Sequence, residues 1–293
     1  KSTISANWNN LSGNAKMTYY PADSWKISAV ISKGFHAPNI DDMAKVFVKG
    51  DNITVPNINL SPEFVYSEEI FISKESKLGV FYFNGFLTQI KNAILKDSAQ
   101  VNLNASINGA PELLVSEVSY EGDSYYIFAN QNTKRTDILG CTFGFDSELI
   151  ENVNFKGDVN FIKGLNQQND SPVPHIPPVF GKLSIQKSGP KLSCFLDFQY
   201  SLNKEAEDFD FAGVDNLDET PYEIINPNSN SEIINYYGLP SWSILNLSLS
   251  YNFSKKINFQ FSINNLLDEH YKSFGSGVSS PGRNFITTFR INY

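Results

Sequence analysis

The sequence is poor in cysteine and histidine, and this scarcity argues against several kinds of site. It contains 2 cysteines and 3 histidines in 293 residues. Cys141 and Cys194 form no C-x-x-C pair and have no zinc-ligand spacing, so we expect two isolated buried or lipid-facing residues. The three histidines, His36, His175 and His270, suggest no Ser/His/Asp grouping, and no Gly-rich phosphate loop ends in Lys-Ser or Lys-Thr. We expect neither an enzyme nor a cofactor.

Positive charge and long apolar runs are also scarce. The 23 Lys and Arg against 31 Asp and Glu give a net charge of -8, which is the wrong sign for a protein that binds nucleic acid. Uninterrupted apolar runs, such as residues 80–83, are far short of the roughly 20 residues that a spanning helix needs. No signal segment follows Lys1, so we expect that one was removed or that the chain begins within a longer protein. Any membrane crossing must therefore use strands.

Strands are what the periodicity predicts. Near the C-terminus, apolar residues alternate strictly with Asn and Ser. The apolar positions are Leu245, Leu247, Leu249, Tyr251 and Phe253, followed after a turn by Ile257, Phe259, Phe261 and Ile263. Each strand thus has one apolar face suited to hydrocarbon and one polar face suited to a wet lumen.

The whole chain divides into about eleven such strands. They are expected near 13–20, 25–34, 63–73, 78–93, 124–148, 153–164, 180–187, 191–203, 242–253, 257–266 and 284–293. Short turns alternate with long connections at 35–62, 94–123, 165–179, 204–241 and 267–283. This alternation predicts an all-β, antiparallel, transmembrane up-and-down barrel. A soluble sandwich or jelly roll is the alternative, but its loops need not alternate in this way.

Two boxes in the sequence resemble those of a known family. Phe35-His36-Ala37-Pro38 and the stretch from Pro56 to Glu63 are similar to the "F-R-A-P" and "N-P-N-L-x-P-E" boxes of TonB-dependent receptors. His36 replaces the usual Arg, and Ile58 replaces a Pro. The tail also resembles the family's C-terminal signature. The matching positions are Phe35, Ala37, Pro38, Leu60, Pro62, Glu63, Asn265, Leu266, Asp268, Tyr271, Gly282, Arg283 and Tyr293.

The resemblance implies a barrel of about 22 strands closed around a plug. Residues 1–293 would then be the C-terminal part of the barrel domain, with the plug outside this chain. The family implies a place in the outer membrane of a Gram-negative bacterium, contact with its lipid, and import of a scarce nutrient driven by TonB, which acts through the plug. The boxes look closest to haem and iron receptors of Bacteroidota, so haem or an iron–siderophore is the expected ligand. The alternatives are a binding or adhesion module without active transport, and a passive porin.

Five residues are the candidates for ligand binding. An imidazole can bind haem iron, so His36 is a possible axial ligand, with Asn39 and Asp41 beside it. A hydrogen-bonded loop histidine is the plainer interpretation. Asp208 and Asp210 lie in the acidic connection 204–241, whose carboxylates would either capture a hard cation or cationic ligand or form a solvated surface. The sequence leaves any metal undecided.

Overall fold

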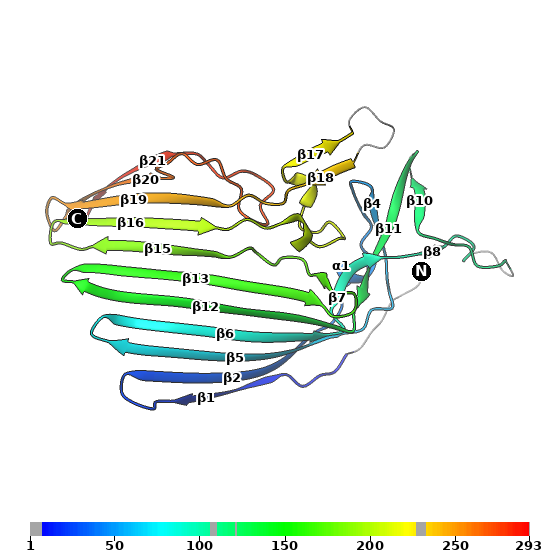
Figure 1. The fold of residues 1–293 in the computed structure, drawn as a ribbon, viewed down its shortest axis with the longest axis horizontal. Coiled ribbons are helices and arrows are strands. Elements are labelled where there is room, and N and C mark those ends of the chain that lie inside the picture. Colours follow the sequence, from blue (N-terminus) through cyan, green and yellow to red (C-terminus); the bar gives the residue numbers. More distant parts are fainter. Residues whose placement is uncertain (1–7, 106–109, 121, 227–232, 293) are drawn as a thin grey trace.

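One large antiparallel sheet runs through the chain (Figure 1). The computed structural model describes residues 8–105, 110–120, 122–226 and 233–292. Along the sheet, in sequence order, the eleven strands of the main path are β1 (Gly13–Tyr19), β2 (Trp25–His36), β5 (Glu63–Ser76), β6 (Gly79–Lys91), β12 (Arg135–Ile150), β13 (Val153–Asn166), β15 (Phe180–Lys187), β16 (Leu192–Ser201), β19 (Trp242–Asn252), β20 (Ile257–Asn264) and β21 (Asn284–Ile291). The short β14 (Ser171–Pro172) pairs beside β13. The predicted all-β architecture is confirmed, and the barrel is half present, with β1 and β21 at its two edges.

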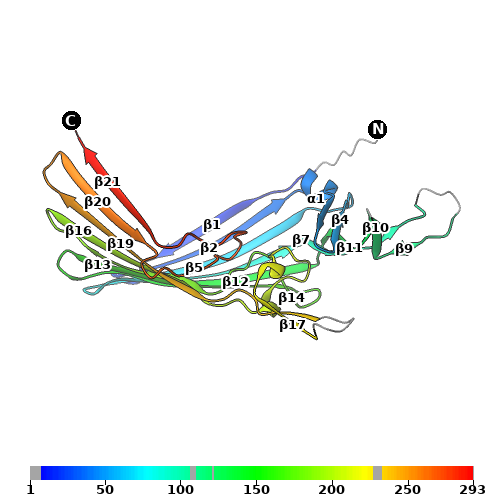
Figure 2. The same ribbon diagram turned by 90° about the horizontal axis from the view of Figure 1, so that it is seen from above.

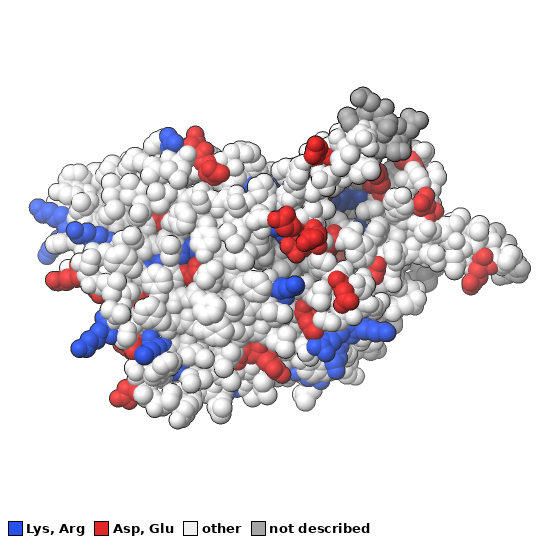
Figure 3. All heavy atoms as spheres, viewed as in Figure 1, with Lys and Arg blue, Asp and Glu red and all other residues white. Residues whose placement is uncertain are grey.

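One face of this sheet carries large apolar side chains in rows. In register, Phe143 of β12 lies opposite Phe83 of β6 and Val159 of β13. Phe143 is 54% exposed and Leu139 is 45% exposed, although a soluble protein rarely leaves so many large apolar groups in water. Figure 3 shows that charged residues lie mainly toward the two ends of the strands, with a largely uncharged region between them. This face is suited to lipid.

The other face is polar, and its side chains bond across the strands. Ser67 and Thr88 hydroxyls are 2.9 Å apart, Ser248 and Ser262 hydroxyls are 2.8 Å apart, and the Thr142 hydroxyl donates to Asn160 at 2.7 Å. The sheet curves so that its two edges lie on the same side (Figure 2). The polar face is therefore suited to line the lumen of a barrel.

The connections alternate in length as predicted, but the long ones are not plain loops. They carry these further elements: α1 (Ile40–Ala44), β3 (Phe47–Lys49), β4 (Asn52–Val55), β7 (Ile94–Ser98), β8 (Val101–Asn102), β9 (Leu114–Val115), β10 (Glu117–Tyr120), β11 (Asp123–Asn132), η1 (Ala206–Asp208), η2 (Leu217–Glu219), β17 (Tyr222–Ile225) and β18 (Ile233–Tyr236). A second sheet joins the first two long connections, with β4 and β11 paired in parallel. Among the described residues, no helix is long and apolar enough to cross a membrane.

The predicted strand 124–148 is wrong as a single element. It divides into β11 and β12 at residues 133–134, and β11 belongs to the second sheet. Ile127, Phe128 and Ala129 are consecutive and all buried, at 1%, 8% and 5% exposure. Three buried residues in a row require packing on both faces, which a barrel strand between lipid and lumen does not provide.

Close packing at a barrel glycine gives a test of the register. Gly140 of β12 lies opposite Phe86 of β6, and a Cβ there would be 2.6 Å from the Phe86 ring and 2.8 Å from the carbonyl oxygen of Phe161. Because the backbone oxygen cannot move aside, Gly140→Val should destabilise the barrel by about 1–3 kcal/mol. The measurement is the temperature at which the full-length protein loses its fast-migrating folded band. Gly34→Val is the control, because no atom lies within 4 Å of a Cβ there, and equal losses in both variants would contradict the packing.

Candidate functional site

A cavity of about 530 Å³ lies where strands of the polar face reach the long-loop end. Phe180 of β15, Ser201 of β16 and Trp242 of β19 are register partners on adjacent strands. Phe180 and Trp242 therefore lie on either side of the Ser201 hydroxyl. The lining residues are Asp158, Pro177, Pro178, Phe180, Gly181, Lys182, Gln199, Tyr200, Ser201, Trp242, Ser273 and Phe274.

Trp242 is the residue of this cavity with an unused donor. Its ring centroid lies 4.5 Å from that of Tyr271, which comes from the connection after β20. Its indole nitrogen Nε1 is buried and has no hydrogen-bond partner in the described part of the chain. A buried unpaired donor costs free energy, so a ligand acceptor at this point would be favoured.

The polar residues of the cavity add charged and hydrogen-bonding groups to its aromatic walls. Lys182 Nζ lies 3.9 Å from Asp158 Oδ1, a loose ion pair, and Gln199 Nε2 donates to Asp197 Oδ2 at 2.6 Å. Aromatic walls with a few placed polar groups suit a planar conjugated ligand that carries charge at its edge.

The tail motif shapes the connection that supplies Tyr271 and Phe274. Asn265 is 3% exposed and adopts the left-handed conformation. Its side chain accepts from the Glu269 amide at 2.9 Å and donates to the carbonyls of Glu269 and Pro281. These bonds tie the start of the connection to its end.

Four further tail residues act in the same region. The Leu266 amide donates to the Leu245 carbonyl at 2.7 Å, which continues the pairing beyond β20. Asp268 accepts from the Arg283 amide at 2.7 Å, and a Cβ on Gly282 would lie 2.9 Å from the same carboxylate. The motif thus holds the loop closed. Tyr293 lies outside the described residues.

The first box forms polar contacts that join two long connections. His36 Nδ1 lies 2.9 Å from Glu63 Oε2, and His36 Nε2 lies 3.7 Å from Asp42 Oδ2. The other oxygen of Glu63 accepts from the Ile94 amide at 2.6 Å. A carboxylate that holds one imidazole nitrogen also fixes the ring, as it does for histidines that bind metals. His36 remains 46% exposed, so its role as a haem ligand stays a prediction.

Asn39 and Asp41 start the short helix α1. The side-chain oxygen Oδ1 of Asn39 accepts from the backbone amides of Asp41 and Asp42 at 2.7 and 3.1 Å, and Oδ2 of Asp42 accepts from the Asn39 backbone amide in return. This is a capping box, which satisfies amides that a helix start leaves free. Ligand binding by Asn39 and Asp41 remains a prediction.

The other box residues provide packing. Phe35 lies opposite Phe64 in the ladder, and Leu60 is 3% exposed. Pro38 and Pro62 are buried, and Ala37 is half-buried.

The acidic connection between β16 and β19 contains a buried ion pair that the sequence analysis did not anticipate. Lys204 and Asp215 have side chains 4% and 2% exposed, with Nζ 3.4 Å from Oδ2. Nζ also donates to the Ile176 carbonyl at 2.7 Å and lies 4.2 Å from the ring centroid of Phe274. Burial lowers the pKa of Lys204, and the charge of Asp215 opposes this shift.

The predicted carboxylates Asp208 and Asp210 lie in the same connection. Asp210 is 5% exposed and accepts from the amides of Val214 and Asp215, both at 3.0 Å, while Asp208 is exposed. In the part of the chain that the structure describes, no three His, Cys, Asp or Glu side chains lie together as a metal site. Among the described residues, no hydrogen bond or ion pair joins these aspartates to His36 or Glu63, so the five predicted ligand residues fall into two groups.

Two lysines connect this acidic connection to the second sheet. Lys96 of β7 donates to the Ala212 carbonyl at 3.0 Å, and Lys49 of β3 donates to the Gly213 carbonyl at 2.5 Å and to the Asn216 side chain. Burial and the nearby charge of Lys49 lower the pKa of Lys96. Three long connections are therefore joined into one assembly at this end of the sheet.

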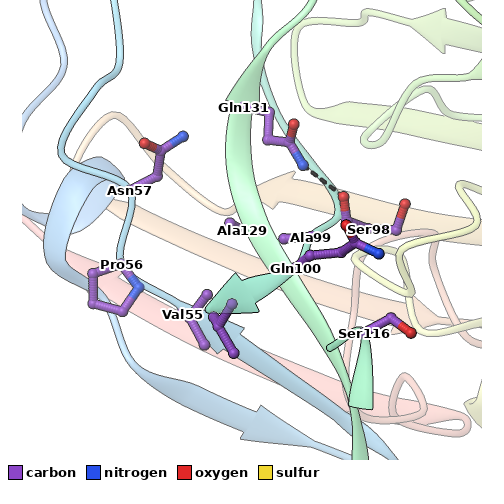
Figure 4. A pocket seen from close by; sticks show the side chains of 10 residues that line it. Val55, Pro56, Asn57, Ser98, Ala99, Gln100, Ser116, Ala129 and Gln131 are labelled. Atoms are coloured by element: carbon purple, nitrogen blue, oxygen red, sulfur yellow. Dashed lines mark hydrogen bonds between the residues drawn. The ribbon is translucent and has the colours of Figure 1, made fainter. Parts of the chain in front are cut away.

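A second cavity, of about 600 Å³, lies inside this assembly (Figure 4). Val55 and Pro56 at the end of β4 form one wall, and Ala129 and Gln131 of β11 form another. Gln131 donates to the Ser98 carbonyl at 2.6 Å across it. No ionisable side chain lines this space, so it suits a neutral group.

The aromatic cavity was missed from the sequence because its walls meet only through register. Trp242 opens a predicted strand and Phe180 opens another, and both could be recognised as strand starts. Their adjacency depends on the pairing of β15, β16 and β19, which alternation alone does not give.

Comparison with known proteins agrees with this architecture. The ferric enterobactin receptor of Pseudomonas aeruginosa, in a G324V mutant form, has a TM-score of 0.68 at 14% identity, with 97% of this chain and 40% of that one covered. The siderophore receptor PirA from Acinetobacter baumannii gives 0.67 at 15% identity, covering 97% and 41%. The copper transporter OprC gives 0.66 at 15% identity, covering 96% and 39%. At these identities the likeness concerns the fold.

A sequence relative and a family profile add to this. The chain is 26% identical over 154 residues to the probable hemoglobin and hemoglobin-haptoglobin-binding protein 4 of Haemophilus influenzae, which covers 50% of this chain and 14% of the relative. The chain thus spans less than half the length of these solved structures and a smaller share of this relative. The profile described as "TonB dependent receptor-like, beta-barrel" matches residues 1–266. With most of its length matched and its strands arranged as in solved receptors, the chain belongs to the β-barrel family of TonB-dependent receptors.

Proposed function

We propose that this chain is the C-terminal half of the barrel of an outer-membrane receptor that imports haem or a ferric siderophore in a Gram-negative bacterium. The apolar face contacts the lipid, and TonB supplies energy through a plug domain outside these residues. Relatives named for siderophore, copper and haemoglobin binding support an iron or metal-complex ligand. The family is one of receptors and transporters rather than enzymes.

The observation that carries this proposal is the aromatic cavity on the polar face. Phe180 and Phe274 provide flat apolar surfaces, and Trp242 has a buried indole N–H without a partner among the described residues. Haem and catecholate siderophores are both conjugated, with anionic or acceptor groups at the edge. The Lys182 ammonium, only loosely paired, attracts that edge.

The loop contacts explain how the ligand would be retained. Phe274 lies against Lys204, and Tyr271 lies against Trp242, so one connection reaches both the acidic loop and the cavity wall. Movement of this connection would open or close the site. An adhesion module without transport is not favoured, because members of the matched family are TonB-dependent.

The first expected result concerns location and barrel closure. Full-length receptor should fractionate with the outer membrane and migrate faster on a gel when unheated than after boiling, because a closed barrel resists detergent. A soluble protein whose migration does not depend on heating would contradict the barrel and the transport proposal together.

The second concerns the aromatic cavity. Trp242→Ala in the full-length receptor should weaken binding of haemin or ferric enterobactin about tenfold, because the variant removes a stacking face and a donor. Titration calorimetry with both probes gives the dissociation constants. Trp25→Ala is the matched control, since Trp25 lies beneath Lys74 near the short-turn end. Equal effects of the two variants would exclude the cavity as the binding site.

The third tests His36. If haem is the ligand and His36 binds its iron, the full-length receptor should shift the haem Soret band, and His36→Ala should weaken that shift. His175→Ala is the control, because His175 also contacts a carboxylate, Asp215, at 3.2 Å. If the shift is unchanged in His36→Ala, His36 does not bind the haem iron. If the parent receptor shows no shift at all, haem is not its ligand.

A further inference from the structure

Pairs of lysines lie in the hairpins at the short-turn end of the sheet. Three of the hairpins there carry two lysines each, at Lys74 and Lys77, Lys187 and Lys191, and Lys255 and Lys256. Several positive side chains are visible at this end in Figure 3. The long connections at the other end hold the acidic segment described above. The two ends therefore differ in charge.

The hairpin of β15 and β16 also contains a cavity, of about 490 Å³. Its lining consists of Lys187, Gly189, Pro190, Lys191, Leu192 and Cys194. Lys187 lies opposite Cys194 in the ladder, so both belong to the apolar row that continues through Ile185 and Leu196. The cavity is thus a mainly apolar surface between two lysine residues, whose ammonium groups can reach its rim.

The turn itself is held in place on both sides. The Ser188 amide donates to the Asn152 carbonyl at 2.8 Å, and the Asn252 amide donates to the Lys191 carbonyl at 2.8 Å. Within the described chain, neither Lys187 nor Lys191 pairs with a carboxylate. The backbone of the turn is therefore held in place, and two lysines without a carboxylate partner lie at the edge of an apolar face.

We propose that this cavity binds one anionic phospholipid of the periplasmic leaflet. The phosphate group lies between the ammonium groups of Lys187 and Lys191, and an acyl chain follows Leu192 and Ile185, which are 54% and 41% exposed. Lysine stems commonly lie along apolar surface while their charges reach the headgroup level. The inference rests on the proposed outer-membrane location, in which the short turns face the periplasm.

The positive charge of the two lysines determines which lipid the cavity prefers. A zwitterionic lipid brings its own ammonium group, which offsets the attraction of the two lysines for its phosphate. A phosphatidylglycerol headgroup carries only the negative charge that they attract. A soluble anion would use the lysines but leave the apolar wall exposed.

The test is native mass spectrometry of the detergent-purified full-length receptor, titrated with phosphatidylglycerol or with phosphatidylcholine. The parent should bind its first phosphatidylglycerol more tightly than phosphatidylcholine. The double variant Lys187→Ala, Lys191→Ala should raise the dissociation constant for that first phosphatidylglycerol about fivefold and leave phosphatidylcholine unchanged. Lys187→Arg with Lys191→Arg should retain the preference.

The matched control is Lys255→Ala with Lys256→Ala, which removes the same charge from the neighbouring hairpin and lies outside the cavity lining. An equal loss in both double variants would mean general attraction to a basic rim and would overturn the site. Equal binding of the two lipids by the parent would also overturn it. The same samples are run unheated and boiled, so a protein that is not a barrel contradicts the proposed function, whereas an intact barrel without lipid preference contradicts only the phospholipid site.

Discussion

The backbone hydrogen-bond ladder is the constraint on which this structure depends. In hydrocarbon, each unpaired amide or carbonyl costs several kcal/mol, so every spanning strand must have a partner on both sides. Here β12 pairs with β6 over Arg135 to Asp146 and with β13 over Thr136 to Ile150, with one irregularity. The sheet pairs continuously from β1 to β21 and leaves these two strands as edges. Known receptors of this fold are more than twice as long as the chain, which is consistent with further strands completing such a ladder.

The ladder also decides where a core can form. Alternate side chains must face lipid and lumen, so neither face of the sheet is packed as the interior of a soluble protein is. Most of the buried apolar residues accordingly lie in the long connections. Ile53 and Ile127 lie in the second sheet, and Phe209 and Leu239 lie in the acidic connection. The connections form a packed cap because each contributes buried groups that the barrel cannot accept.

These differences explain what the sequence could and could not predict. Period-two alternation and turn residues are local, so the eleven strands and the alternating connections were found, with most ends within a few residues. The pairing of β4 with β11 joins segments more than 70 positions apart, and no local pattern encodes it. The burial of Lys204 against Asp215 likewise depends on how the whole connection folds, which its local composition does not encode. The aromatic cavity required the register of three strands.

The residues of the family boxes chiefly hold the structure in place. The shape of the loop is therefore set by other residues than those available to contact a ligand. Asn265 and Asp268 close the connection after β20 through backbone bonds, which any ligand-specific variant of the receptor can keep. The closed loop carries Tyr271, which lies against Trp242, and Ser273 and Phe274, which line the cavity, and Phe274 also lies over Lys204. Lys204 is buried with Asp215, so displacing Phe274 would expose a desolvated ion pair and an aromatic ring together. Phe274 therefore links the cavity on the polar face to the buried ion pair of the acidic connection.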